Sequence, residues 1–285
     1  MREIGLNINS SKENSTYILA DVCNVIKDTF GNEANIHIFE DGEIEEYVQK
    51  NDLEIMIVLG GDGTIIRAAR ALCKYSIPIL GINIGNLGFL ASVETGDIKK
   101  AFEYIKENKY NVEERMMISC SINHEGQLKE FFVLNDVVVS KGALSRMIKY
   151  KISVDNNLYA DFSADGIIIS TPTGSTAYGL SAGGPIIHPS LNLIEIIPIC
   201  PHVAGMRPLI IDCNSEVIIE TKGWKESIFM TIDGQESLKL QEDSLIGAKM
   251  APFKCKLIRL QDYDYFKVLR EKIIWRTREI GCEGE

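Results

Sequence analysis

The chain has 285 residues, of which 45% are hydrophobic and 25% charged, the balance expected of a folded enzyme. Forty acidic and thirty basic residues give a net charge of −10, which argues against nucleic-acid binding and against docking on anionic lipid. The densest apolar run, Leu193–Cys200, is too short for a membrane span and contains Glu195, so a cytoplasmic location is expected. The seven cysteines include no CxxC pair and the four histidines are scattered, which argues against a structural zinc site.

The N-terminal part of the chain alternates between strand and helix patterns. Strands are predicted at Glu3–Asn9, Asn35–Phe39, Leu53–Leu59 and Ile77–Ile82, and helices at Asn14–Phe30, Thr64–Tyr75 and Asp97–Asn108. The strand at Leu53–Leu59 is almost continuously apolar, as expected when both faces of a sheet are covered. This alternation predicts an α/β domain with a parallel sheet and helical crossovers.

Short β-rich runs separated by turn residues follow, and they predict a mostly antiparallel β-rich C-terminal domain. The predicted strands are Met116–Ile122, Phe131–Val139, Ile148–Val154, Gly166–Thr171, Ser215–Thr221 and Cys255–Leu260. Thr173–Ala182 shows no alternation and is interpreted as a loop that enters a short helix, and Tyr265–Trp275 has helical spacing. The predicted domains are an α/β domain at 1–110, a β-rich domain at 111–262 and a tail at 263–285.

A glycine-rich turn, Gly60–Thr64 (Gly-Gly-Asp-Gly-Thr), lies between an apolar strand and a predicted helix, where ligands collect in α/β sheets. Glycines let the backbone approach a phosphate, and a helix start offers unpaired N–H groups. Asp62 within this turn suits a general base for an attacking hydroxyl or a partner for magnesium. Arg67 follows Gly63 by four residues and is therefore predicted to lie one helical turn from it, on the same face of the helix. The alternative is an ordinary tight turn with an Asp facing solvent.

Two polar stretches in the β-rich part are further candidates. Asn135 and Asp136 interrupt an apolar run; because adjacent strand residues point to opposite faces, both can serve one ligand only at a strand end or bulge. Such a pair suits the base and ribose of a nucleoside, and the alternative is a turn. In Thr171–Gly184, hydroxyls and glycines follow a buried-looking strand, with Tyr178 available to pack on a planar base. The alternative there is a flexible loop.

Taken together, these stretches resemble the NAD kinase family, which is marked by a GGDGT turn, an Asn-Asp or Asn-Glu pair, and a T-P-T-G-S-T-A-Y segment ahead of Ser-Ala-Gly-Gly-Pro. Further similar stretches are Gly85–Leu90, Pro198–His202, Arg207–Pro208 and Asp233–Gln235. The likeness extends from about Leu53 to Gln235. GGDGT alone also occurs in lipid kinases and phosphofructokinases, whereas the T-P-T-G-S-T-A-Y segment with the Asn-Asp pair is highly specific. The chain has no Gly-Lys dipeptide, which excludes a Walker A loop.

The resemblance implies phosphorylation of the 2′-hydroxyl of the adenosine ribose of NAD to give NADP, an alcohol-acceptor phosphotransferase reaction with ATP as donor and magnesium as cofactor. Asp62 would be the catalytic proton acceptor. Residues implied to contact ATP or its phosphates are Gly60, Gly61, Gly63, Thr64 and Arg67. Residues implied to line the cleft for NAD are Asp62, Gly63, Arg67, Asn135, Asp136, Arg146, Ser163, Asp165, Thr173, Thr176, Ala177, Tyr178, Gly179, Leu180, Ser181 and Gln235.

The resemblance also implies homo-oligomers, dimers or tetramers, whose subunits complete each other's sites, and a tail that packs on the first domain. No fixed protein ligand is predicted for magnesium, which would travel on ATP near Asp62. The loop His202–Arg207 departs from the hydroxyl-rich pattern usual in the family. Two other functions remain open. The first is a lipid kinase, which the lack of a basic patch or amphipathic anchor in the sequence argues against. The second is a catalytically silent dinucleotide sensor, which the intact Asp62 argues against.

Overall fold

The computed structural model describes residues 2–8, 15–40, 43–85, 88–142, 146–222, 227–241 and 244–274. Several positions named or spanned above, Asn9, Asn14, Asn86, Leu87 and Trp275, lie outside these ranges. The chain divides into two compact units, which are described separately below. Unit 1 comprises Met1–Glu113 with Lys256–Glu285, and unit 2 comprises Glu114–Cys255.

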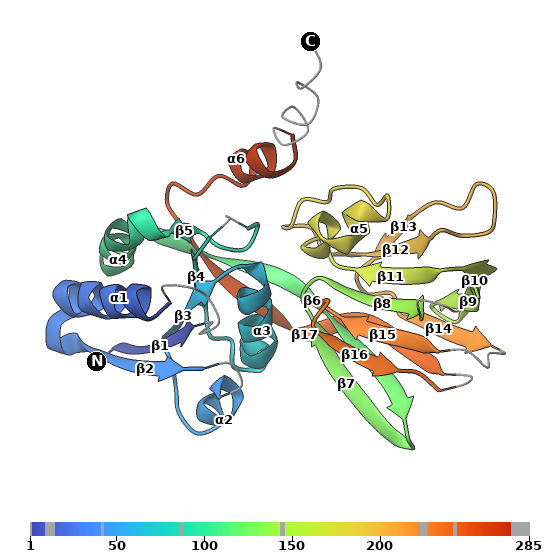
Figure 1. Cartoon of the computed structure of the whole chain (residues 1–285), viewed down its shortest axis with the longest axis horizontal. Coiled ribbons are helices and arrows are strands. Elements are labelled where there is room, and N and C mark those ends of the chain that lie inside the picture. The colour runs from blue at the N-terminus through green and yellow to red at the C-terminus, as the bar shows by residue number, and fades with distance from the viewer. Residues whose placement is uncertain are drawn as a thin grey trace, which may run out of the picture. The chain divides into compact units, whose positions relative to one another are not determined.

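Unit 1 is an α/β unit with a parallel sheet in the order β4-β3-β1-β2 (Figure 1). Its strands are β1 (Arg2–Ile8), β2 (Ala34–Phe39), β3 (Ile55–Gly60), β4 (Ile79–Asn83) and β5 (Val93–Glu94), the last pairing with β4. Its first four helices are α1 (Ser15–Phe30), α2 (Ile44–Val48), α3 (Asp62–Leu72) and α4 (Ile98–Lys106). The predicted parallel sheet is confirmed, whereas the short helix α2 was not predicted.

The core of unit 1 forms where the sheet meets α1 and α4. Every residue of β3 is buried, which explains its continuous apolar sequence. Helix α4 buries its predicted stripe, Ile98, Ala101, Phe102 and Ile105, and α1 contributes Val22 and Ile26 to the same cluster. Burial of side chains of this size stabilises a fold by roughly 1.5–3 kcal/mol each. This burial stabilises the parallel sheet, of which β3 leads directly into the glycine-rich turn.

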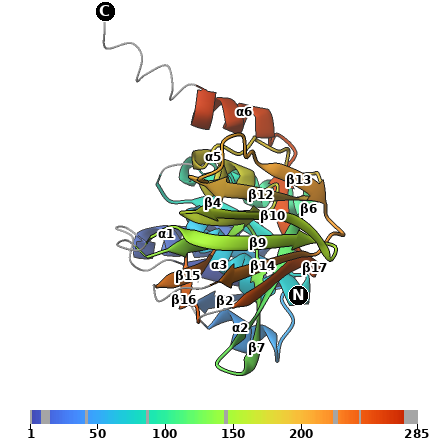
Figure 2. The same ribbon diagram turned by 90° about the vertical axis from the view of Figure 1, so that its right-hand side faces the viewer.

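Unit 2 consists mainly of antiparallel strands, as predicted. One sheet has the order β13-β12-β11-β8-β15-β16, and other strands pair in the order β10-β9-β14-β17, with β6 pairing to β17 and β7 (Figures 1 and 2). The bounds are β6 (Tyr110–His124), β7 (Gln127–Val133), β8 (Asp136–Lys141), β9 (Ile148–Val154), β10 (Asn157–Ala164), β11 (Gly166–Ser170), β12 (Leu193–Ile199), β13 (Leu209–Asp212), β14 (Val217–Lys222), β15 (Ile228–Ile232), β16 (Glu236–Lys239) and β17 (Leu245–Leu260).

Three element predictions need correction. The single strand predicted at Phe131–Val139 is wrong, because β7 ends at Val133 and β8 begins at Asp136. The predicted strand Cys255–Leu260 is only the end of β17, which starts at Leu245 and also pairs with β14. The predicted tail helix is a short α6 (Tyr265–Leu269) followed by a π-helical turn at Arg270–Ile274. Pairing partners far away in the sequence decide where these elements end.

The β8–β11–β12 sheet of unit 2 has two different faces. One packs on a large apolar core that includes Val137, Ile169 and Ile196. The other carries a smaller cluster of Val138, Ile168 and Ile197, against which Ala182 packs. Alternate residues of a strand point to opposite faces, so neighbours in the sequence separate into the two layers. The segment Gly174–Gly184, including the predicted short helix α5 (Tyr178–Ser181), covers the second face.

Candidate active site

The glycine-rich turn of unit 1 joins β3 directly to α3. Gly61 is the extended N-cap of α3, and its carbonyl accepts hydrogen bonds from the amides of Thr64 and Ile65. Any side chain at Gly60 would collide with Thr64, so glycine is required there. Gly63 and Arg67 are both exposed, one helical turn apart. The N-terminus of α3 thus offers amide groups, a positive dipole end and a guanidinium for an anion.

Asp62, the first residue of α3, is held by a distant loop. Its Oδ2 accepts a hydrogen bond from the amide of Phe89 at 2.8 Å, and its Oδ1 accepts one from the amide of Leu90 at 3.0 Å. Gly88 lies so close that a methyl group on its Cα would overlap the Asp62 carboxylate. The loop thereby fixes the orientation of the carboxylate that the sequence marks as the proton acceptor.

Asn83, the last residue of β4, lies beside this turn because it pairs in register with Gly60. Its side-chain nitrogen donates to the carbonyl of Gly85 at 2.7 Å, while its buried Oδ1 has no hydrogen-bond partner among the described residues. A buried acceptor of this kind costs free energy unless something donates to it. The carboxyl ends of β3 and β4 therefore carry polar groups suited to a bound molecule.

In unit 2 the Asn135–Asp136 pair sits at a strand end, as its sequence required. Asp233, in the turn after β15, accepts hydrogen bonds from the amides of Asn135 at 2.7 Å, Leu134 at 3.1 Å and Asp136 at 3.2 Å. The carboxylate therefore fixes the backbone on both sides of Asn135 just before β8 begins. Both side chains of the pair line one pocket.

Asp136 is a buried carboxyl close to a second one. Its side chain accepts the backbone amide of Tyr178, while burial and the nearby charge of Asp233 raise its pKa from 3.8 to about 7. A carboxyl in this state can accept or donate a hydrogen bond near neutral pH, according to its protonation. It thereby connects the start of β8 to the start of α5.

The hydroxyl-rich segment is a formed structure, in which several hydroxyls bond internally. Thr171 Oγ1 donates to the carbonyl of Leu134 at 2.6 Å, and the buried Ser175 Oγ donates to that of Pro172 at 2.7 Å and accepts from the amide of Ile187. These hydroxyls stabilise the loop and are not available to a ligand. The alternative of a flexible loop is therefore wrong, and Tyr178 at its tip is 46% exposed.

These elements enclose a pocket of about 360 Å³ within unit 2. Its lining consists of Asn135, Asp136, Val138, Ser140, Ala177, Tyr178, Thr231, Asp233 and Gly234. The pocket combines an aromatic ring, an amide, two carboxyls and two hydroxyl-bearing side chains over an apolar floor. This is the chemistry that recognises a nucleoside, whose base stacks and whose ribose presents hydroxyls.

Other predicted residues of unit 2 lie elsewhere. Thr173 is buried and receives a hydrogen bond from Arg115 Nη1 at 3.4 Å, and Gln235 closes the turn after β15. Asp165 pairs with Lys141 at 2.8 Å, at the opposite end of β8 from Asp136. Neither Asp165 nor Ser163 on β10 is among the residues that line the pocket within unit 2, although Ser140, which does line it, pairs in register with Gly166. Arg146 is exposed just before β9.

Residues 8–110 match the family described as the ATP-NAD kinase N-terminal domain, and residues 134–260 match the ATP-NAD kinase C-terminal domain. The chain is 46% identical over 285 residues to NAD kinase of Clostridium botulinum (strain ATCC 19397 / Type A), and the match covers 100% of both chains. It is 45% identical to NAD kinase of Clostridium beijerinckii, and that match covers 100% of this chain and 99% of the relative. The chain belongs to the NAD kinase family. The resemblance recognised in the sequence is thus confirmed.

Two solved structures share the fold of this NAD kinase family member. One is yeast NADH kinase complexed with NADH, with a TM-score of 0.86 and 20% identity, covering 100% of this chain and 89% of that one. The other is an NAD kinase from Archaeoglobus fulgidus in complex with ATP, with a TM-score of 0.76 and 23% identity, covering 96% of this chain and 99% of that one. At these identities the likeness establishes the fold.

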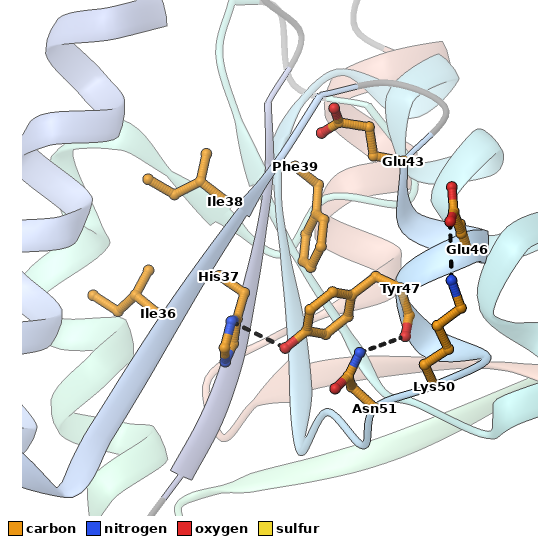
Figure 3. Close-up of a pocket in the computed structure, with 9 residues that line it drawn as sticks. All are labelled: Ile36, His37, Ile38, Phe39, Glu43, Glu46, Tyr47, Lys50 and Asn51. Carbon is orange, nitrogen blue, oxygen red and sulfur yellow. Dashed lines mark hydrogen bonds and ion pairs between the residues drawn. The ribbon is translucent and has the colours of Figure 1, made fainter.

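Unit 1 of this NAD kinase family member also has a shallow surface hollow of about 680 Å³ between β2 and α2 (Figure 3). Its polar side chains bond to one another: His37 to Glu3 at 2.7 Å and to Tyr47 at 3.0 Å, and Lys50 to Glu46 at 3.0 Å. His37, Phe39 and Tyr47 lie together on one side of β2, whereas Ile36 and Ile38 point to the other. None of the predicted site residues lines this hollow.

The described residues also bear on metal binding and on membrane spanning. Among them, no group of three or more His, Cys, Asp or Glu side chains is arranged to hold a metal ion. No described helix is long and apolar enough to cross a membrane.

The sequence did not point to Asp233, Gly88 or the amides of Phe89 and Leu90 as groups that hold the candidate site residues. Asp233 has a backbone φ of +50°, which is unusual for a residue other than glycine and marks a constrained turn. The Asp-Gly turn at Asp233 and Gly234 was visible in the sequence as part of the family likeness. Its hydrogen bonds to Leu134–Asp136 join residues almost a hundred positions apart, and no local pattern signals them.

Proposed function

We propose that the chain is an NAD kinase that transfers the terminal phosphoryl group of ATP to the 2′-hydroxyl of the adenosine ribose of NAD, giving NADP. The observation that carries this proposal is the full-length 46% identity to named NAD kinases, with Asp62 intact at the start of α3. The reaction needs a dinucleotide site and a proton acceptor beside a phosphate site. Groups suited to binding a dinucleotide lie in unit 2. Groups suited to accepting a proton and binding phosphate lie in unit 1.

The unit 2 pocket would hold NAD. Tyr178 offers an exposed ring for a base, while the amide of Asn135 and the carboxyl of Asp136 offer hydrogen bonds to base edges or ribose hydroxyls. Asp233 and the Tyr178 amide already hold Asn135 and Asp136 in place without a ligand. The entropic cost of ordering this pair when NAD binds is therefore small. Ala177, Gly179, Leu180, Ser181, Thr173 and Thr176 belong to the same segment and are proposed to complete this face.

Asp62 would accept the proton of the attacking hydroxyl. Phosphoryl transfer passes through a loose transition state, so most of the rate gain comes from alignment and charge stabilisation. The amides of Phe89 and Leu90 hold the Asp62 carboxylate in one orientation, which favours alignment. Arg67 and the N-terminal amides of α3, with Gly60, Gly61, Gly63 and Thr64, would bind the phosphates of the donor.

Magnesium is proposed as part of the MgATP substrate. Both Asp62 oxygens accept backbone amides, so the protein already holds this carboxylate. A carboxylate held in this way fits a cation carried by phosphate oxygens. When bound, magnesium would neutralise charge developing on the transferred phosphoryl group.

We further propose that the protein acts in the cytoplasm as a homo-oligomer, a dimer or tetramer. Asp165 and Ser163 are not among the residues that line the pocket within unit 2, although the family likeness implicates both residues in NAD binding. Oligomers whose subunits complete each other's sites would reconcile the two facts. The tail at 263–285 is proposed to pack on the first domain, and its residues beyond 274 lie outside the part of the chain that the structure describes.

The test is an assay for NADP formation, run with ATP or polyphosphate as donor and with NAD or NADH as acceptor. NADP formed from NAD and MgATP by the wild type, and lost in Asp62→Asn, supports the proposal. An inactive wild-type protein that still binds NAD would favour the dinucleotide sensor instead. Phosphorylation of a diacylglycerol or sphingosine with no NADP formed would establish a lipid kinase.

A further inference from the structure

A row of polar side chains crosses the covered face of the β8–β11–β12 sheet. Asp136 on β8 pairs in register with Ser170 on β11, and Ser170 pairs with Glu195 on β12. Residues directly opposite each other on neighbouring strands point to the same face. Glu195 therefore lies two strands from Asp136, on the face that binds the Gly174–Gly184 segment. The next row on this face is apolar: Val138, Ile168 and Ile197.

Glu195 is fully buried beneath that segment. Neither carboxyl oxygen has a hydrogen-bond partner among the described residues. Gly184 lies directly over it, since a methyl group on the Gly184 Cα would come within 2.7 Å of Glu195 Oε1. Gly179 and Gly184 both pack against Ile197 Cδ1, so the turn of α5 rests on β12 at Glu195 and Ile197. The carboxyl is thus part of the floor on which the segment carrying Tyr178 lies.

The segment that covers Glu195 supplies no cation to pair with it. Residues 174–192, which include the covering segment, contain no Lys or Arg, and their titratable side chains are Tyr178 and His188. Across the strands Glu195 pairs with Ser170 and with Ile210 on β13. The other acidic groups facing this row are Asp136 and, at the edge, the exposed Asp212, which accepts hydrogen bonds from Asn214. Burial raises the pKa of Glu195 from 4.5 to about 7.

We infer that Glu195 is a positioning residue for the dinucleotide pocket: its neutral carboxyl lets the Tyr178–Gly184 segment close on the sheet, and loss of its proton loosens that segment. A charged carboxylate without a partner is strongly disfavoured in such a place. Water that reaches the charged carboxylate would lower this free-energy cost. For water to enter, the α5 turn that covers Glu195 must move away from the sheet. Because Asp136 accepts the Tyr178 amide, lifting this turn also disturbs the pocket.

The inference rests on the proposed function only where it concerns NAD. The closed segment and the bound dinucleotide both favour the protonated carboxyl, so binding is coupled to proton uptake at Glu195. As pH rises from 6 to 8, the protonated fraction falls about tenfold for a group that titrates near 7. NAD affinity is expected to fall by up to that factor, and Glu195→Gln, which stays neutral, is expected to remove this part of the pH dependence.

The first experiment needs no ligand. Hydrogen exchange of the Tyr178–Gly184 amides, corrected for the intrinsic effect of pH, is followed from pH 6 to pH 8 in the wild type, Glu195→Gln and Glu195→Leu. The wild type is expected to lose roughly tenfold in protection, and both neutral variants to retain it. Glu220→Gln is the matched control, because Glu220 lies on β14 in the same unit and pairs with Lys151 at 3.0 Å. Equal loss in the wild type and in whichever neutral variant folds would overturn the inference.

The second experiment is calorimetric titration of NAD over the same pH range. A smaller pH dependence of NAD affinity in Glu195→Gln than in the wild type and Glu220→Gln supports the coupling, and equal slopes would overturn it. If the wild type binds no NAD, the proposed function fails, while the exchange data still decide whether Glu195 controls the segment. If exchange and affinity both respond to pH only through Asp136, Glu195→Gln will behave as the wild type, which again contradicts the inference.

Discussion

The Oδ1 atom of Asp233 accepts the backbone amide of Asn135 at 2.7 Å, which fixes one half of the polar pair in the unit 2 pocket from a turn almost a hundred residues away. Burial, and in addition the charge of the same carboxylate, raises the pKa of Asp136, the other half. One side chain therefore fixes the position of Asn135 and contributes to the charge state of Asp136.

Asp233→Asn should weaken this arrangement without changing the backbone, since asparagine also tolerates the positive φ at this position. The amide retains one acceptor oxygen, so at least one backbone amide loses its partner, which costs about 1–3 kcal/mol of stability. NAD affinity should fall as well, because Asn135 is less well held. Urea unfolding and NAD titration check both effects. A variant that loses stability but binds NAD normally would show that Asp233 supports the fold alone.

Gly88→Ala should impair catalysis strongly, because the added methyl group overlaps the Asp62 carboxylate. Either the loop or the carboxylate must move, and both hydrogen bonds to Asp62 then suffer. Gly96→Ala is the matched control in the same unit, since nothing lies within 4 Å of a methyl group there. The expected result is a lower kcat for Gly88→Ala, with a near-normal KM for NAD and near-normal activity of the control. Full activity of Gly88→Ala would contradict the proposed orientation of Asp62.

Asp62→Asn should reduce turnover by about 10²–10⁴-fold, the usual loss when a general acid–base group is removed. NAD affinity should change little, because binding is shared among many contacts. The amide retains one acceptor oxygen for the amides of Phe89 and Leu90, so a modest loss of stability is also expected. Single-turnover kinetics and thermal melts separate the two effects. Near-normal turnover would exclude Asp62 as the base.

Asn135→Ala should weaken NAD binding roughly 5- to 150-fold, which corresponds to the loss of about 1–3 kcal/mol from unpaired polar groups in the pocket. ATP binding should be nearly unchanged, because the donor is proposed to bind at the Gly60–Thr64 turn. Asp136→Ala should behave similarly toward NAD. Calorimetric titrations with NAD and ATP, beside thermal melts, test these expectations. Unchanged NAD affinity with a lowered melting temperature would assign both residues to the scaffold.

Asp136→Asn should change how stability depends on pH. Because the pKa of Asp136 is raised from 3.8 to about 7, the folded chain keeps this proton where the unfolded chain has lost it. The stability contribution of Asp136 therefore falls as pH rises from about 4 to 7 and is constant above that range. Relative to the wild type, the variant should gain up to about 4 kcal/mol across this window, at 1.36 kcal/mol per pKa unit. Parallel urea-unfolding profiles over pH 4–8 would disprove the raised pKa.

The local sequence by itself determined the helices with a clear apolar stripe and the chemistry carried on short stretches. Periodic apolar residues predict α1, α3 and α4 to within a few residues, because an amphipathic helix needs only its own spacing. The glycines around Asp62 predict a tight turn between strand and helix, because only glycine fits where Gly60 packs on Thr64. The Asn135–Asp136 pair was expected at a strand end for a geometric reason, and it is there.

The tertiary structure alone decided which groups meet and how they titrate. The break between β7 and β8, the amides that hold Asp62, and the row from Asp136 to Glu195 all depend on partners distant in the sequence. In the sequence Glu195 is merely a charge that interrupts an apolar run. Its burial on β12 beneath Gly184, without a hydrogen-bond partner among the described residues, follows from strand register, because a shift of one residue would move its side chain to the other face of the sheet.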